Sequence, residues 1–127
     1  MNVALDRELT VLVTAGRGHA RLPVLRRAVA GACSKAGLPV DRMDDAGLIL
    51  DALLADSRVA RAAEVHLVLS AQPGSFALML GPLADSEAER LLEQARLPVV
   101  GPVIERLATS AVTVDGGSHL LIFVDAA

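Results

Sequence analysis

The chain has 127 residues, of which 53% are hydrophobic but only 2% are aromatic. We expect one domain over residues 1–127, with residues 1–8 as a short lead-in. The net charge is -3 and the arginines are scattered, which excludes the basic stripe typical of a nucleic-acid-binding protein. No apolar run is long enough to cross a bilayer, and the N-terminus lacks the pattern of a signal peptide. A single cysteine, Cys33, excludes an internal disulfide, so we expect a cytoplasmic protein without a membrane partner.

The first half of the chain predicts a strand and two helices. Leu9–Thr14 alternates as strands do, and residues 15–21 are expected to form a loop. Helical spacing of apolar residues predicts helices over Leu22–Ala36 and Asp41–Val59, the second capped by Asp41. One face of the second helix is expected to enter the core, with Met43, Ala46, Ile49, Leu50, Leu53 and Leu54.

The second half predicts two antiparallel hairpins with helices between them. Tight turns are expected at Gln72-Pro73-Gly74 and at Asp115-Gly116-Gly117. A charged helix over Asp85–Gln94 and a short one over Gly101–Ala108 separate the hairpins. The predicted strands are Glu64–Ala71, Ser75–Gly81, Ser110–Val114 and Ser118–Val124. This order predicts an α+β two-layer sandwich with a mostly antiparallel sheet and helices on one face.

Two sequence features resemble patterns that mark ligand sites in other proteins, but in this chain we interpret them as structural. The stretch Gly16-Arg17-Gly18-His19 has part of a phosphate-loop pattern, but a plain loop is the better interpretation. The histidines His19, His66 and His119 lack the spacing of metal ligands, so no metal site is predicted.

Three stretches resemble the anti-sigma-factor serine kinases of bacteria, which are members of the GHKL (Bergerat-fold) ATPase family. Ala28–Pro39 resembles the first helix of that family, Leu48–Asp56 its second helix, and Val99–Ser110 the glycine-led helix after its ATP lid. The resemblance covers residues 9–124. It implies a histidine-kinase-ATPase-like domain, ATP and Mg²⁺ as cofactors, and a homodimer.

The nucleotide motifs that the family uses are degenerate in this chain. Asp51 matches the acidic residue that acts as general base in the family and is the catalytic candidate. Ala55 stands where the family has the asparagine that holds Mg²⁺, and Asp56 is the nearest carboxylate that could replace it. Gly101 is what is left of the phosphate loop, since Pro102 has no N–H to donate. Ala55, Asp56 and Gly101 are therefore the cofactor-binding candidates.

Three hypotheses of function follow. In the first, the chain has lost ATP binding and kinase activity, and regulates transcription by binding a protein such as a sigma factor or an anti-sigma antagonist. In the second, it is an ATP-dependent serine/threonine protein kinase whose atypical site uses Asp51 and Asp56. In the third, the resemblance is accidental and the domain binds an unrelated ligand.

The charged segment before Gly101 carries a further expectation. We expect an ordered helix over Ser86–Gln94, capped by Asp85 or Ser86. Leu91 or Leu92 is expected to fill the vacated nucleotide pocket beside Asp51 and Ala55. The outer face is then free for a protein partner, with Glu89, Arg90 and Glu93.

Overall fold

A computed structural model describes residues 9–127, so the lead-in expected over residues 1–8 lies outside the described part of the chain. The elements follow in the order β1 (Leu9–Gly16), α1 (Arg21–Ala36), α2 (Val40–Ala55), α3 (Ser57–Arg61), β2 (Glu64–Gln72), β3 (Ser75–Leu80), α4 (Glu87–Gln94), β4 (Arg96–Leu97), β5 (Gly101–Pro102), α5 (Val103–Leu107), β6 (Ser110–Val114), a 3₁₀ turn η2 (Asp115–Gly117) and β7 (His119–Asp125).

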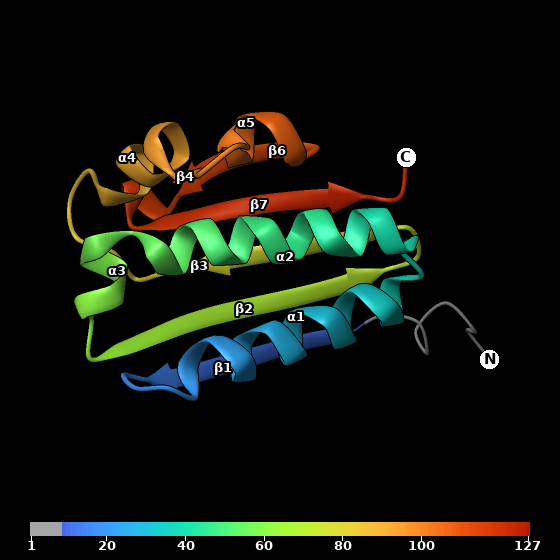
Figure 1. The fold of residues 1–127 in the computed structure, drawn as a ribbon, viewed down its shortest axis with the longest axis horizontal. Coiled ribbons are helices and arrows are strands. Elements are labelled where there is room, and N and C mark those ends of the chain that lie inside the picture. The colour runs from blue at the N-terminus through green and yellow to red at the C-terminus, as the bar shows by residue number, and fades with distance from the viewer. Residues whose placement is uncertain (1–8) are drawn as a thin grey trace.

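The predicted α+β two-layer sandwich is confirmed. Five strands form one sheet in the order β1-β2-β3-β7-β6, and every neighbouring pair is antiparallel. Helices α1 and α2 lie on one face of the sheet and run roughly along its strands, and α4 and α5 pack beside them at the β7-β6 edge (Figure 1). Strands β4 and β5 form a separate two-residue ladder. In the part of the chain that the structure describes, no helix is long and apolar enough to cross a membrane.

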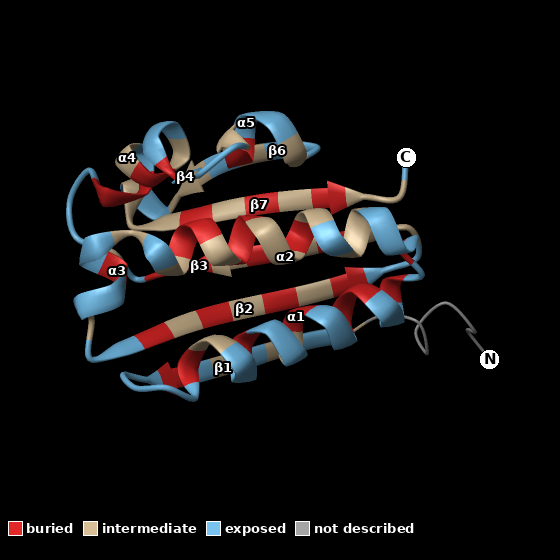
Figure 2. Cartoon of the chain, viewed as in Figure 1, coloured by how far each residue is buried: buried red, intermediate tan, exposed pale blue. Residues whose placement is uncertain are grey.

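The core lies between the helices and the one sheet face that they cover (Figure 2). The predicted core face of the second helix is largely confirmed. Ile49, Leu50 and Leu53 are at most 1% exposed, whereas Met43 and Leu54 pack at the margin. Cys33 is buried on α1, and burial raises the pKa of its thiol to about 12, so the thiol stays protonated at neutral pH.

The single helix expected over Asp41–Val59 is wrong. Helix α2 ends at Ala55, and Asp56 has an extended backbone (φ −60°, ψ 133°). The Asp56 carboxylate then accepts hydrogen bonds from the backbone N–H groups of Arg58 and Val59, at 3.0 and 3.3 Å. Asp56 is therefore the N-cap of a new helix, α3, because a short carboxylate competes with the helical backbone for these donors.

Three other expected boundaries are corrected. Helix α2 begins at Val40, so Pro39 and not Asp41 is its N-cap. Strand β1 runs to Gly16, because Thr14, Ala15 and Gly16 continue the ladder with β2. Gly101–Pro102 pairs with β4 in place of starting the helix, which begins at Val103.

A buried arginine connects the end of β1 to the end of α3. The Arg21 side chain donates to the carbonyl of Gly16 at 2.8 Å and to that of Ala62 at 2.7 Å. Weaker hydrogen bonds reach the carbonyls of Val59, Ala60 and Ala63. Arg21 is only 8% exposed, and two of these carbonyls, those of Val59 and Ala60, lie in the last turn of α3. Hydrogen bonds to backbone carbonyl oxygens therefore offset the free-energy cost of burying the guanidinium.

We expect Arg21→Met to lower the free energy of unfolding by about 3 kcal/mol, because several buried carbonyls lose a charged donor while the apolar stem is kept. Urea denaturation followed by circular dichroism measures this change. Arg27→Met, at an exposed position of the same helix, is the matched control and should change stability by less than about 0.5 kcal/mol. Equal effects of the two substitutions would show that the Arg21 hydrogen bonds do not stabilise the fold.

Candidate functional site

Asp51, the catalytic candidate, forms an ion pair with helix α1. Its two carboxylate oxygens accept hydrogen bonds from Nε and Nη2 of Arg26, at 2.9 and 2.7 Å. The Asp51 carboxylate in turn raises the pKa of the Arg26 guanidinium. Both carboxylate oxygens of Asp51 are therefore engaged by Arg26 in the isolated chain.

Ala55 follows Asp51 by one helical turn, and the two residues line one hollow of about 300 Å³. We call it the Asp51 hollow. Its other walls are formed by the β1-α1 loop and by the ends of α2 and α3, with Arg17, Gly18, His19, Arg21, Leu22, Leu54 and Ala60. The hollow is not filled by α4, so the expectation that Leu91 or Leu92 closes it is wrong.

Helix α4 forms where the charged segment predicted it, but it packs elsewhere. Leu91 is fully buried, and α4 packs against β6, β7 and α5 rather than beside Asp51. Ser86 precedes the helix but makes no side-chain capping bond. On the expected outer face, Glu89 and Glu93 are exposed, whereas Arg90 is turned inward and paired.

Asp56, a cofactor-binding candidate, is held by Arg90 of α4. The Arg90 guanidinium donates to its two carboxylate oxygens at 2.6 and 2.8 Å. This side-chain hydrogen bonding is the main reason why the pKa of Asp56 is lowered, and the backbone donors of the cap add to it. Asp56 therefore stabilises the contact between α3 and α4, and its oxygens do not line the Asp51 hollow.

Glu87 and Arg58 complete a neutral cluster with Asp56 and Arg90. Glu87 is buried and accepts hydrogen bonds from Nη2 and Nε of Arg90 at 2.7 and 3.2 Å. Its other oxygen accepts from Nη1 of Arg58. Two acids and two bases thus alternate across the gap between α3 and α4, and burial of Glu87 is compensated by two cations.

Gly101, the last candidate, lies apart from the other three. It pairs with Leu97 in the β4-β5 ladder, with φ of +80°, a conformation that favours glycine. The sets of residues that line the Asp51 hollow and the apolar pocket described next do not include it. The structure therefore brings together Asp51 and Ala55, but neither Asp56 nor Gly101 joins them.

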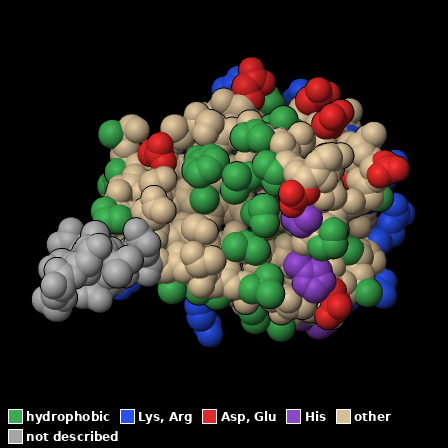
Figure 3. Space-filling model, turned by 180° about the vertical axis from the view of Figure 1, so that it is seen from behind, with side chains coloured by type: hydrophobic (Ala, Val, Ile, Leu, Met, Phe, Trp, Pro, Cys, Tyr) green, Lys and Arg blue, Asp and Glu red, His purple; other side chains and the backbone are tan. Residues whose placement is uncertain are grey.

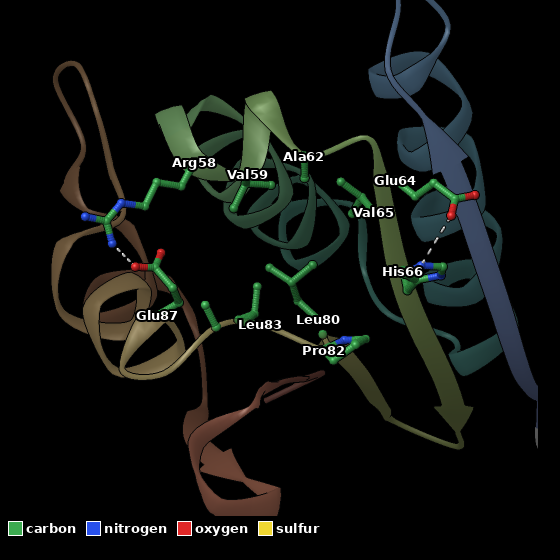
Figure 4. Close-up of a pocket in the computed structure, with 12 residues that line it drawn as sticks. Arg58, Val59, Ala62, Glu64, Val65, His66, Leu80, Pro82, Leu83 and Glu87 are labelled. Atoms are coloured by element: carbon green, nitrogen blue, oxygen red, sulfur yellow. Dashed lines mark hydrogen bonds and ion pairs between the residues drawn. The ribbon is translucent and has the colours of Figure 1, made fainter.

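A different cavity, which we call the apolar pocket, lies between α3, the start of β2, the end of β3 and the start of α4 (Figure 4). Its volume is about 310 Å³. Most of its wall is apolar, formed by Val59, Ala62, Val65, Leu80, Gly81, Pro82, Leu83 and Ala84. Ionisable side chains stand at two sides of it: Arg58 with Glu87, and Glu64 with His66.

The sheet face opposite the helices is the third candidate surface, and we call it the open face. Strand residues alternate across the sheet, so the residues next to the buried ones point to this face. They are Thr10, Leu12, Thr14, Gly16, Glu64, His66, Val68, Ser70, Gln72, Ser75, Ala77, Met79, Ser110, Val112, Val114, His119, Leu121, Phe123 and Asp125. None of these is Lys or Arg, and the two acidic residues, Glu64 and Asp125, stand at strand ends. Figure 3 shows the face from behind, with hydrophobic side chains spread over it and the histidines at one side.

Residues 9–127 contain no group of three or more His, Cys, Asp or Glu side chains placed to hold a metal ion.

No protein-family model matches the chain, and a search of the curated proteins finds no match either. The likeness to the GHKL family thus rests on the sequence stretches named above and stays a prediction.

Sequence reasoning missed the partners of the two acidic candidates. Arg26 and Arg90 are distant from Asp51 and Asp56 along the chain, and nothing local marks such pairs. Within this cluster, the sequence spacing indicates one ion pair, that of Glu87 and Arg90, which are three residues apart on a predicted helix.

We expect Arg90→Gln to raise the pKa of Asp56 towards the ordinary value of about 3.9. A lowered pKa means that ionised Asp56 stabilises the fold above about pH 3.9 and loses this effect as the pH falls through the lowered value. The variant should therefore be less stable at pH 7 and lose less stability on acidification. Carboxyl NMR titration and urea denaturation at pH 7 and 3 measure both effects.

Arg96→Gln, at an exposed position of β4, is the control and should leave the pKa of Asp56 unchanged. If Arg90→Gln also leaves it unchanged, the ion pair between α3 and α4 does not form in solution.

Proposed function

We propose that this chain is a regulatory protein that acts by binding another protein, and that the partner docks on the open face. One apolar side chain from each strand lies in register across the middle of this face, in the order Leu12, Val68, Met79, Leu121 and Val112. This uncharged apolar row is the observation that carries the proposal. Leu12 is 68% exposed and Val112 is 43% exposed. Contiguous exposed apolar surface of this kind marks interaction sites.

The sequence of the central strands supports the same proposal. Strand β3 reads SFALML and β7 reads HLLIFVD, so apolar residues occupy both faces of each strand. Such near-continuous runs are typical of strands that are covered on both sides, whereas a face exposed to water is usually polar. In the described part of the chain the helices cover one side only. A second layer supplied by a partner would complete the burial.

The chemistry of the open face limits what the partner is. With no Lys or Arg among its residues, the face lacks the cationic side chains that a nucleic acid or an anionic membrane surface requires. The partner must itself present an uncharged, apolar surface, as a folded protein does. The resemblance to anti-sigma-factor kinases makes a sigma factor or an anti-sigma antagonist in the cytoplasm the proposed partner.

A second copy of this chain also presents such a surface, and we propose a weak homodimer. Five strands about 4.8 Å apart and about five residues of about 3.3 Å each give a face of roughly 400 Å². Stable complexes bury about 800 Å² per partner. Two open faces alone therefore associate weakly, which leaves the face available to a larger partner.

The loss of ATP binding and kinase activity belongs to the same proposal. Ala55 has no side-chain oxygen for Mg²⁺, and Asp51 and Asp56 are each bound at both carboxylate oxygens by an arginine. The alternative, an active kinase with an atypical site, would use Asp51 while Arg26 is bound to both of its carboxylate oxygens.

Leu12→Lys tests the proposal, because it buries an unpaired charge wherever a partner covers the open face. We expect the tagged wild-type chain to capture a sigma factor or an anti-sigma antagonist from its own cells, identified by mass spectrometry. Leu12→Lys should capture at least about tenfold less, which corresponds to about 1.4 kcal/mol. Light scattering at high micromolar concentration should show a dimer fraction that the variant lacks.

Val40→Lys is the matched control, since Val40 is 74% exposed but lies on α2, in the helical layer. It should capture as much partner as the wild type. Equal capture by both variants would refute docking on the open face, and capture that depends on MgATP would favour the kinase alternative.

A further inference from the structure

Strand β1 forms an outer edge of the five-stranded sheet, and its ladder with β2 shows which backbone groups point outward (Figure 1). The Arg17 N–H donates to the carbonyl of Ala63 at 3.1 Å, and this pair continues the β1-β2 register. The N–H and C=O groups of successive strand residues point to opposite sides, so Thr10, Leu12 and Thr14 direct theirs away from β2. These backbone groups are available to a further strand.

The edge lacks the features that usually prevent strand addition. Strand β1 reads LTVLVTAG over eight residues, without charge or proline. Within residues 9–127, no strand lies on its outer side. The outward carbonyl of Gly16, where the strand ends, accepts a hydrogen bond from Nε of Arg21 at 2.8 Å. The preceding stretch, Thr10–Thr14, is therefore the part of the edge that an extended segment can pair with.

A groove runs along the same edge, between β1 and the outer side of α1. Its volume is about 380 Å³. Apolar side chains form most of its wall: Leu9, Val11, Ala28, Ala32 and Leu69. At Gly31, which also lines the groove, a Cβ atom would meet nothing within 4 Å, so there is room for a side chain. A strand added to β1 would direct every second side chain to this side of the sheet.

Two cations, Arg27 and Lys35, complete the wall of the groove on α1, and among the described residues no Asp or Glu lines it. Both side chains are exposed, and neither forms an ion pair within residues 9–127. Their separation of eight residues corresponds to about 12 Å along the helix. Residues i and i+4 of a strand lie about 13 Å apart, and α1 runs roughly along β1. Two residues of an added strand, four positions apart, would therefore meet the two cations.

We propose that β1 binds an extended acidic segment of a partner protein as an added antiparallel strand. Acidic residues at positions i and i+4 of this segment face Arg27 and Lys35, and an apolar residue at i+2 lies beside Gly31. Main-chain hydrogen bonds supply affinity, and the groove selects the side chains. A second copy of β1 fits less well, because it has no acidic residue and would bring the cations of two α1 helices together. This edge site does not rest on the docking proposed for the open face.

The test titrates peptides with blocked ends into the whole chain and follows its amides by NMR. The peptide TETVTET carries the proposed pattern, and TKTVTKT and TQTVTQT are its basic and neutral counterparts. We expect TETVTET to bind at least about tenfold more tightly than TKTVTKT, because attraction replaces repulsion at the groove. With TETVTET at saturation, hydrogen exchange of the Thr10, Leu12 and Thr14 amides should slow by about tenfold or more, since these N–H groups gain acceptors.

A modified peptide tests the main-chain pairing. In an antiparallel pair, residues on the open side of the sheet turn their amides towards β1, and residues on the groove side turn theirs away. N-methylation of the two central threonines of TETVTET should therefore abolish binding. N-methylation of its valine is the control and should be tolerated.

The double variant Arg27→Gln, Lys35→Gln tests the groove. It should bind TETVTET about fivefold more weakly and TQTVTQT as the wild type does, since two exposed ion pairs are lost and the main-chain bonds stay. Arg61→Gln with Arg96→Gln removes the same charge at exposed positions outside the groove and should leave both affinities unchanged. Melting curves establish that both double variants are folded, and the peptide comparisons on the wild type decide the test if one is not.

Four results would overturn the proposal. They are no binding of TETVTET at millimolar concentration, equal affinity for TETVTET and TKTVTKT, binding that leaves exchange of the three β1 amides unchanged, and slow exchange of these amides in the dilute chain without peptide. The third result would indicate unspecific attraction of charge, and the fourth an edge that is already covered.

Discussion

The position of helix α3 depends on one buried cation. Arg21 carries five N–H donors, and these must find acceptors wherever the fold buries the guanidinium. The carbonyls of Val59, Ala60, Ala62 and Ala63 are arranged around it, together with that of Gly16. The same backbone carries one wall of the apolar pocket. The geometry of this pocket is therefore linked to a residue at the start of α1 that does not line it.

Arginines have a similar role at the other end of the molecule. Arg42 of α2 donates to the carbonyls of Asp125 and Leu107 at 2.8 and 3.0 Å, and to Oγ1 of Thr109 at 3.1 Å. These bonds join α2 to the ends of α5 and β7. A core of Ala, Val and Leu provides burial with little directionality, whereas hydrogen bonds from a planar guanidinium require a defined arrangement. We infer that the arginines supply much of the specificity in a chain that has almost no aromatic residues.

Features with a local signal were predictable from the sequence. Alternation in the strands and helical spacing in α1 and α2 gave the correct fold class, and the pairing of Asp51 with Ala55 follows from one helical turn. The end of α2 was missed because apolar residues continue to Val59, although Asp56-Ser57 is a capping signal. The location of Leu91 was missed for another reason: helical spacing predicts that a side chain is buried but does not say against which element. The arginine partners of Asp51 and Asp56 lie 25 and 34 residues away, beyond any local pattern.

We propose that a protein partner covers the open face. Met79 lies in the middle of its apolar row, and Met43 lies on α2 in the helical layer, so the two methyl groups report on opposite sides of the molecule. Methyl NMR with a soluble paramagnetic agent measures their accessibility in the isolated chain and in the complex with the captured sigma factor or antagonist. We expect the agent to broaden the Met79 methyl signal in the dilute isolated chain and to leave it sharp in the complex, while the Met43 signal does not change. Equal broadening of the Met79 signal in both states would contradict the proposal.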